Sequence, residues 1–323
     1  MLVHTFNPLE DRRWMTFVNA HPLSSVFHTT PYLDALRRTY GYQPIVYTTS
    51  QPGEPLVNGI VLCRVSSWLT GSRLVSVPFA DHCEPLVSGA GDRMAIVAAI
   101  QQTVLEGGMK YAQIRAVHSD LAEAAGSSAP RTLASHTLDL TPRLEWLYRA
   151  LHSTIKEPLR RAEQEGVRHA SGQSELLLQQ FYALLVAARR RRGLPPQRLQ
   201  WFLNLAACFG ERLSVHVASL AGQPRAAILT LRHNNVLLYK NGVSDELADP
   251  LGTMPLLMWK AIVDGKARGL DTFDLGRTDA ASPGLGTFKE RLGAAPSTLT
   301  YVRWAEAGRQ FTRFRPRTQL CLQ

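Results

Sequence analysis

MPLLMWKAIVDGKARGLDTFDLGR (residues 254–277) and MAIVAAIQQTVLEGGMKYAQIRAV (residues 94–117) share one pattern: an amphipathic helix, a glycine stop and a buried strand. Glycine after a helical run favours helix termination, and the apolar run that follows predicts a strand. Residues 39–65 and 208–234 also match, each with a helix end, a glycine, a strand, a tight turn and a strand. Both matches lie roughly 160–170 residues apart, which indicates an internal duplication of one α/β unit.

Outside these stretches the chain continues to alternate helices with strands, the pattern of a mixed α/β protein. Helices are expected at residues 11–20, 30–38, 92–105, 143–165, 173–192, 198–209 and 254–268. Strands are expected at residues 44–49, 58–65, 73–78, 111–117, 213–220, 226–232, 236–239, 272–275 and 297–304. The small-residue stretch SDLAEAAGSSAP (residues 119–130) separates a predicted domain 1–130 from a predicted domain 131–323.

Composition indicates a folded protein with a reduced, metal-free interior. The 323 residues are 45% hydrophobic and 8% aromatic, enough for two cores. Four cysteines form no CxxC pair, so neither a zinc site nor a disulfide framework is expected. The sequence shows no apolar signal core and no stretch of about 18 apolar residues, which predicts a cytoplasmic protein without an integral membrane segment.

Charge and motifs narrow the function classes. Lys and Arg number 36 against 26 Asp and Glu, and the net charge of +10 attracts polyanions such as tRNA, nucleotide-linked substrates or anionic lipid surfaces. An arginine-rich proteome explains the same surplus, so charge alone does not choose the partner. No H-E-x-x-H, G-x-S-x-G or P-loop motif occurs, and metal-dependent or serine-hydrolase chemistry is not indicated.

The segment DTFDLGRTDAASPGLGTFKERLG (residues 271–293) resembles the C-terminal signature of the FemAB family of aminoacyl and acyl transferases. In that signature a buried strand ends in a D-x-G-R-like turn, and a glycine-rich loop leads to F-K-x-x-x-G. Four upstream blocks resemble the family in the correct order: VFHTTPYLDALRRTYGYQP (26–44), LRRAEQEGV (159–167), RRRRGLP (189–195) and LLYKNGVSDE (237–246).

The resemblance implies two tandem GNAT-like domains, each with a mixed central sheet flanked by helices. It implies an N-acyltransferase that forms an amide without a metal or redox cofactor. The implied donor is aminoacyl-tRNA, and the implied acceptor is an amine of a cell-envelope precursor, such as one of peptidoglycan, or of a metabolite. Some family members use a pair of long antiparallel helices against tRNA, and no heptad region of that size occurs here.

Three residues of the signature are the predicted catalytic set. Lys289 would hold a donor phosphate and stabilise the oxyanion, Asp274 would orient the attacking amine, and Arg277 would clamp a carboxylate or phosphate. The structural alternatives are a solvated helix lysine and an internal ion pair that shapes the turn. No general base is assigned. The predicted substrate-binding residues are Phe288, Tyr239, Lys240, Asn241, Tyr182, Arg160 and Arg190, with solvated helix faces as the alternative for the arginines.

The donor remains open between two chemistries. GNAT domains that use CoA carry an R/Q-x-x-G-x-G/A loop, whereas SDELADPLGTMPLL (residues 244–257) has one glycine and the acids Asp245, Glu246 and Asp249. Negative side chains would repel a pyrophosphate, which disfavours CoA. The alternatives are an acyl-CoA- or carrier-protein-dependent N-acyltransferase of envelope or exopolysaccharide biosynthesis, and a non-catalytic binding protein on a GNAT scaffold.

Overall fold

The structure is a computed structural model that describes residues 1–68, 71–117, 131–245, 252–279 and 282–305. The chain forms two compact units. The first contains Met1–Leu133 and the chain from Thr298, and the second contains Ala134–Ser297. The predicted linker at residues 119–130 lies outside the described residues, as do part of the 244–257 loop and Cys321.

The first unit is a mixed sheet with the strand order β1-β2-β3-β4-β5-β12. All neighbours pair antiparallel except β4 and β5, which are parallel and are joined through helix α3. The elements are β1 (His4–Phe6), α1 (Arg12–Ala20), η1 (Val26–His28), α2 (Thr30–Tyr40), β2 (Gln43–Thr48), β3 (Ile60–Val65), β4 (Arg73–Val75), α3 (Ala90–Glu106), β5 (Tyr111–Ala116) and β12 (Ala295–Ala305).

Alternation along β2 divides the first core between the two faces of this sheet. Tyr47 belongs to the cluster formed with Ile96 and Ile100 of α3. On the other face Val46 and Trp14 of α1 lie so close to Gly59 that a Cβ there would be 2.8 Å from the indole. Because successive strand residues point to opposite faces, one short strand serves both layers.

The second unit has a sheet with the order β6-β11-β10-β9-β8-β7, in which only β10 and β11 are parallel. Helix α8 connects these two strands. The elements are β6 (Arg131–Asp139), α4 (Leu144–Ala150), α5 (Ser153–Gln164), β7 (Arg168–Gly172), α6 (Glu175–Arg191), α7 (Leu199–Phe209), η3 (Gly210–Arg212), β8 (Leu213–Leu220), β9 (Gln223–His233), β10 (Val236–Ser244), α8 (Thr253–Ala267), β11 (Thr272–Thr278) and α9 (Pro283–Arg291).

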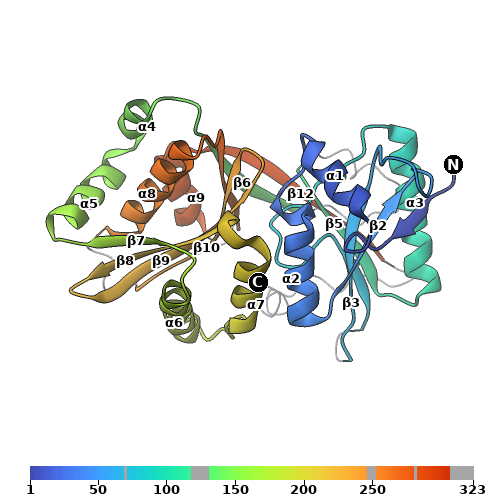
Figure 1. Cartoon of the computed structure of the whole chain (residues 1–323), viewed down its shortest axis with the longest axis horizontal. Helices are drawn as coiled ribbons and strands as arrows, with labels where there is room; N and C mark the ends of the chain where they lie inside the picture. The colour runs from blue at the N-terminus through green and yellow to red at the C-terminus, as the bar shows by residue number, and fades with distance from the viewer. Residues whose placement is uncertain (69–70, 118–130, 246–251, 280–281, 306–323) are drawn as a thin grey trace. The chain divides into compact units, whose positions relative to one another are not determined.

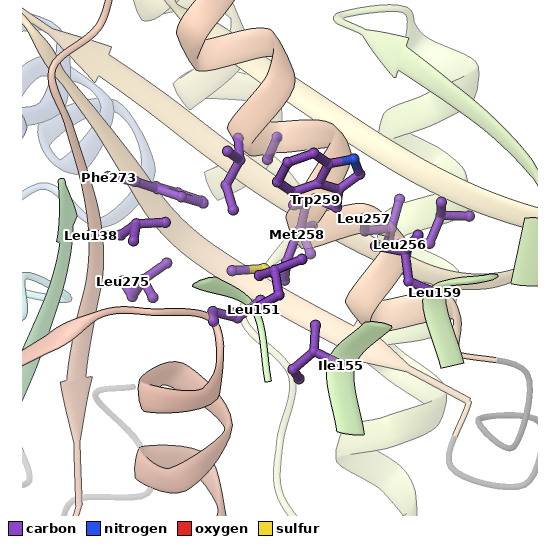
Figure 2. Packing of buried hydrophobic residues seen from close by; sticks show 14 of the residues in the cluster. Leu138, Leu151, Ile155, Leu159, Leu256, Leu257, Met258, Trp259, Phe273 and Leu275 are labelled. Carbon is purple, nitrogen blue, oxygen red and sulfur yellow. The ribbon is translucent and has the colours of Figure 1, made fainter. Parts of the chain in front are cut away.

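Helices cover both faces of the second sheet (Figure 1). α5 and α8 pack together on one face, and α6 with α7 covers the other. Figure 2 shows the core of the α5–α8 face, where Ile155 and Leu159 of α5, Met258 of α8 and Phe273 of β11 belong to one buried cluster. Burial of such apolar side chains supplies the main stabilisation of the unit.

The two units repeat one topology, which confirms the predicted mixed α/β class with tandem GNAT-like halves. The hairpin β2–β3 corresponds to β8–β9, β4–α3–β5 corresponds to β10–α8–β11, and β1 corresponds to β7. The last strand of each order comes from a different part of the sequence: β12 pairs with β5, and β6 pairs with β11. The partition therefore differs from the predicted boundaries 1–130 and 131–323, because β5 takes its antiparallel neighbour from the end of the chain.

Several predicted elements have different limits in the structure. The helix expected at 143–165 is two helices, α4 and α5, because His152 caps α5 by accepting a hydrogen bond from the amide of Thr154. The strand expected at 73–78 ends at Val75, since Val77 and Phe79 have positive φ angles of 43° and 61°. Strands β1, β6 and β7 and helix α9 were not predicted as such.

Candidate functional site

The parallel strands β10 and β11 pair over only a short length. Their register runs Val236–Thr272, Leu237–Phe273 and Leu238–Asp274, and it ends there. Beyond Leu238, β10 continues against β9 as far as Ser244, and beyond Asp274, β11 continues against β6 as far as Thr278. The carboxyl-terminal halves of these strands are thus not bonded to each other, which is the kind of place where open α/β sheets bind ligands.

Both strands carry an irregularity where their shared pairing ends. On β10 the register with β9 shifts between Tyr239 and Asn241, which leaves Lys240 as the extra residue. On β11 the register with β6 shifts between Asp274 and Arg277, so that two residues oppose His136 alone. β-Bulges redirect side chains and are common beside active sites. The predicted site residues of β10 and β11 are therefore gathered at one place in the second unit.

Lys289 fixes the bulge of β11 from helix α9. The residue is 2% exposed, and its Nζ donates to the carbonyl oxygens of Gly276 and Arg277, each at 2.9 Å. Asp274 is 7% exposed, and its Oδ1 accepts the amide hydrogen of Gly276 at 2.8 Å, as in an Asx turn. Gly276 has a φ of +68°, a conformation that favours glycine. The signature thus folds into one hydrogen-bonded turn.

His136, which sequence reasoning missed, lies opposite this bulge and is 1% exposed. Its Nδ1 is 3.4 Å from Oγ1 of Thr278, and its Nε2 is 3.6 Å from a carboxylate oxygen of Glu290. Burial and the nearby ammonium of Lys289 lower the pKa of His136, which Glu290 partly opposes. The imidazole is therefore neutral at pH 7. A lone histidine on an unpredicted strand gave no sequence signal.

Tyr239 and Asn241 mark the bulge of β10. The Tyr239 hydroxyl folds over Gly242, where an added Cβ would lie only 1.7 Å from the oxygen. Burial raises the pKa of Tyr239 to about 12, so the phenol is protonated at neutral pH. The Oδ1 atom of Asn241 is buried without a hydrogen-bond partner among the described residues. Buried polar atoms are usually bonded, so this oxygen is a candidate for a substrate donor group.

Helix α8 follows β10 in the chain and leads into β11. Its N-cap, Gly252, has a φ of +68°, and an added Cβ would lie 2.1 Å from the carbonyl oxygen of Pro158 in α5. No acidic residue occurs in the first turn of α8. Asp245, at the end of β10, pairs with Arg191 of α6 at 3.5 Å. The predicted repulsion of a pyrophosphate by Asp245 is therefore partly offset, while Glu246 and Asp249 lie outside the described residues.

Comparison with known proteins agrees with this geometry. Residues 149–290 match the family model described as an acetyltransferase (GNAT) domain. Across most of its length the chain also follows the fold of FemX. The TM-score is 0.71 at 12% identity, with 93% of this chain and 97% of FemX covered. The chain resembles the FemAB-like proteins.

Other solved structures match as well. The C-terminal domain of a putative lysylphosphatidylglycerol synthetase from Agrobacterium fabrum has a TM-score of 0.61 at 17% identity, covering 93% of this chain and 92% of that one. A tandem GNAT protein from the clavulanic acid biosynthesis pathway has a TM-score of 0.60 at 12% identity, covering 96% and 100%. No curated protein sequence matches the chain. At these identities the structural matches establish the fold.

Within this FemAB-like fold, the remaining predicted residues lie on helices rather than on β10 or β11. The Tyr182 hydroxyl, on α6, donates to the carbonyl of Gln197 at 3.0 Å and so ties α6 to the segment before α7. Arg190 is exposed on α6, and it is the neighbouring Arg191 that reaches the end of β10. Arg160 is exposed on α5, and Phe288 packs against the core of the second unit. Their substrate contacts stay predictions.

The equivalent place in the first unit is occupied by the chain itself. β4 and β5 pair only at Leu74–Ala112 and Val75–Gln113. Past that point Oγ of Ser76 accepts the amide hydrogen of Arg115, and the Glu84 carboxylate accepts that of Val117. His28 fastens this segment, since its Nε2 lies 2.8 Å from the carbonyl oxygen of Glu84. The two halves of the FemAB-like fold therefore differ at corresponding strands.

The described part of the chain contains no group of three or more His, Cys, Asp or Glu side chains that could hold a metal ion. Over the same residues, no helix combines the length and apolar character needed to cross a membrane.

Proposed function

We propose that this chain is an N-acyltransferase that transfers an aminoacyl group from aminoacyl-tRNA to an amine of a cell-envelope precursor or metabolite. The observation that carries the proposal is the separation of β10 from β11 after Leu238 and Asp274, with a bulge on each strand. Asn241 follows the bulge of β10, and Asp274 and Arg277 flank the bulge of β11, in the part of the chain (149–290) that matches a GNAT acetyltransferase domain.

The reaction depends mainly on the correct positioning of the amine and the aminoacyl ester. The neutral amine nitrogen attacks the carbonyl carbon of the aminoacyl ester, a C–N bond forms, the C–O bond to the tRNA ribose breaks, and the amine proton passes to the ribose oxygen. Asp274 is proposed to orient the amine and Arg277 to bind a carboxylate or phosphate. Lys289 supports both by holding the backbone of the turn. His136, held neutral, is proposed to accept the amine proton and pass it to the leaving ribose oxygen.

Charge supports a polyanionic donor. The chain carries a net +10, and Arg160 and Arg190 are exposed on helices where phosphates can reach them. Arginine binds phosphate through two parallel hydrogen bonds, which suits it to such contacts.

An acyl-CoA donor is the second candidate, for two reasons. The matching family model is that of GNAT acetyltransferases. The first turn of α8 has no acidic residue and no side-chain cap, so its backbone amides suit an anion, and Arg191 partly offsets Asp245.

The test is a binding comparison between charged tRNA and acetyl-CoA, each titrated with salt, on the wild type and on Asn241→Leu. Asn204→Leu, on α7, is the matched control for loss of an amide side chain. Mass spectrometry of an amine mixture incubated with each donor then identifies any amide product.

Steep salt dependence of tRNA binding, with an aminoacylated product that Asn241→Leu reduces at least tenfold, is the expected result. Saturable acetyl-CoA binding without specific tRNA affinity would transfer the assignment to the second candidate. Binding of neither donor, with no amide product, would overturn both and leave the non-catalytic scaffold.

A further inference from the structure

Helix α4 presents an aromatic and basic face to solvent. Leu144 and Leu147 point inward and pack with the core of the second unit. On the opposite side Arg143, Trp146 and Arg149 follow one another at three-residue spacing, which places them on one face of the helix. Trp146 is 60% exposed, although side chains as large and apolar as tryptophan are usually mostly buried. Figure 1 shows α4 at the periphery of the second unit.

Aromatic rings hold the cations of this face in place. The guanidinium of Arg149 lies 5.1 Å from the centroid of the Trp146 ring. Tyr148 packs edge-on against Trp259 of α8, which anchors its ring. Over that ring lies the ammonium of Lys156, at 5.9 Å, and Nε of Arg160 donates to the Tyr148 hydroxyl at 3.3 Å. Arg143, Trp146, Arg149, Lys156 and Arg160 form what we call the α4 patch.

The positive charge of the α4 patch is not neutralised by an ion pair. Among the described residues, no carboxylate pairs with Arg143, Arg149, Lys156 or Arg160. Other surface cations of the chain do have such partners, for example Arg268 with Asp264. Glu145 and Glu157 on the same helices leave the surplus positive. An exposed indole among unpaired cations has the chemistry of a surface that binds anionic groups.

We propose that the α4 patch docks the protein on an anionic phospholipid bilayer. Indole rings favour the headgroup level of a membrane, and arginine and lysine beside them reach lipid phosphates. Arg149 already covers the Trp146 ring, whereas a stacking platform for nucleic-acid bases needs an open ring face. The patch also occupies two short helices rather than a track along which a strand could lie. A bilayer therefore fits better than RNA.

Docking through α4 has a consequence for the second unit that does not depend on which acyl donor it uses. α5, which carries Lys156 and Arg160, touches the start of α8 at Pro158 and Gly252. A bilayer bound by the patch would then lie close to the start of α8, the helix that connects β10 with β11. Arg160 is shared with the proposed tRNA contacts, so the patch is tested through Trp146, Arg149 and Lys156, which have no role in the proposed acyl transfer.

The test is co-sedimentation of the full chain with vesicles of phosphatidylcholine, with and without phosphatidylglycerol. Binding is expected only to the vesicles that contain phosphatidylglycerol, together with a blue shift of tryptophan fluorescence that Trp146→Ala abolishes. Each cation near an anionic membrane strengthens binding about fivefold, so Arg149→Gln with Lys156→Gln should weaken it roughly 25-fold.

Two matched control variants test whether binding depends on the α4 patch itself or only on total positive charge and on an exposed tryptophan. Arg12→Gln with Arg64→Gln removes the same charge from the first unit, and Trp68→Ala removes another exposed tryptophan, one that is 97% exposed. Both should bind vesicles within about twofold of the wild type. Equal losses in patch and control variants would overturn the proposal. So would the absence of vesicle binding, or RNA binding that the patch variants abolish while vesicles fail to compete.

Discussion

Nζ of Lys289 lies 2.9 Å from the carbonyl oxygen of Gly276, and this bond joins helix α9 to the bulge of β11. Lys289→Met should lower the free energy of unfolding by about 3 kcal/mol, because two buried carbonyl oxygens lose a charged donor. Urea denaturation followed by circular dichroism measures the change. Lys266→Met is the control, since Lys266 donates to one carbonyl at the surface and should change stability by less than about 1 kcal/mol.

Equal, small effects of these two substitutions would contradict the structural role of Lys289. A large effect limits the catalytic interpretation, and turnover of the Lys289 variants should then be compared at a temperature where each is fully folded.

The contact between Tyr239 and Gly242 predicts strong coupling at the β10 bulge. Gly242→Ala must displace the tyrosine ring, and should cost about 1–3 kcal/mol in unfolding free energy. In a Tyr239→Ala background the same substitution should cost much less, and the double-mutant cycle measures the difference. Gly91→Ala, which meets nothing within 4 Å, should be close to neutral. Additive effects of the two substitutions would show that the ring does not lie there.

Gly252 lies so close to Pro158 that a Cβ at position 252 would clash with it. The cost of this clash can be measured separately from the strain of the positive φ angle. Gly252→Ala meets both a φ of +68° and the Pro158 carbonyl, whereas Gly269→Ala has a φ of +70° with nothing within 4 Å. The Gly269 substitution should cost about 1 kcal/mol, and the Gly252 substitution at least about 2 kcal/mol more. Thermal and urea unfolding of both variants measure this difference. Matching losses would mean that α5 can move away from α8 at little cost.

A histidine pair predicts loss of stability in acid. Nε2 of His169 lies 3.2 Å from Nδ1 of His216, and Lys260 and Asp264 of α8 and its C-cap Arg268 act on the pair through their charges. Burial, and then His169, lower the pKa of His216 from 6.5 to about 4. The unfolded chain therefore binds more protons between these values. The stabilisation is complete above about pH 6.5 and falls as the pH drops towards 4, by about 3 kcal/mol at most.

Urea unfolding across this pH range should show a flatter dependence for His216→Gln than for the wild type. Superimposable pH profiles for His216→Gln and the wild type would contradict the linkage.

Local signals in the sequence predicted the repeat well. Periodicity and glycine stops located α3 with β5 and α8 with β11, because these elements are long and end at residues with clear conformational preferences. The resemblance to the FemAB family, rather than these local signals, assigned Asp274, Arg277, Tyr239 and Asn241 to one site, and the structure has these residues on the neighbouring strands β10 and β11.

Those local signals could not predict which strands pair when they are far apart in the sequence. A strand was predicted at 297–304 but not its pairing with β5, and β6, which pairs with β11, was not predicted at all. His136 became a site residue only through β6, and the burial of Lys289 depends on a fold that brings α9 against β11. The local sequence around a lysine is the same whether its ammonium is solvated or buried against two carbonyl oxygens. Only the tertiary contacts distinguish the two cases.

The pairing of β12 with β5 also constrains synthesis of the protein on the ribosome. β5 is translated early, but the strand that covers its open edge ends at residue 305. At about 5–20 residues per second, roughly 10–40 seconds separate the two. Throughout that interval the nascent first unit presents an unpaired strand edge, which is a template for aggregation. Chaperone dependence and sensitivity to C-terminal truncation should therefore be greater than for a GNAT domain that completes its sheet in chain order.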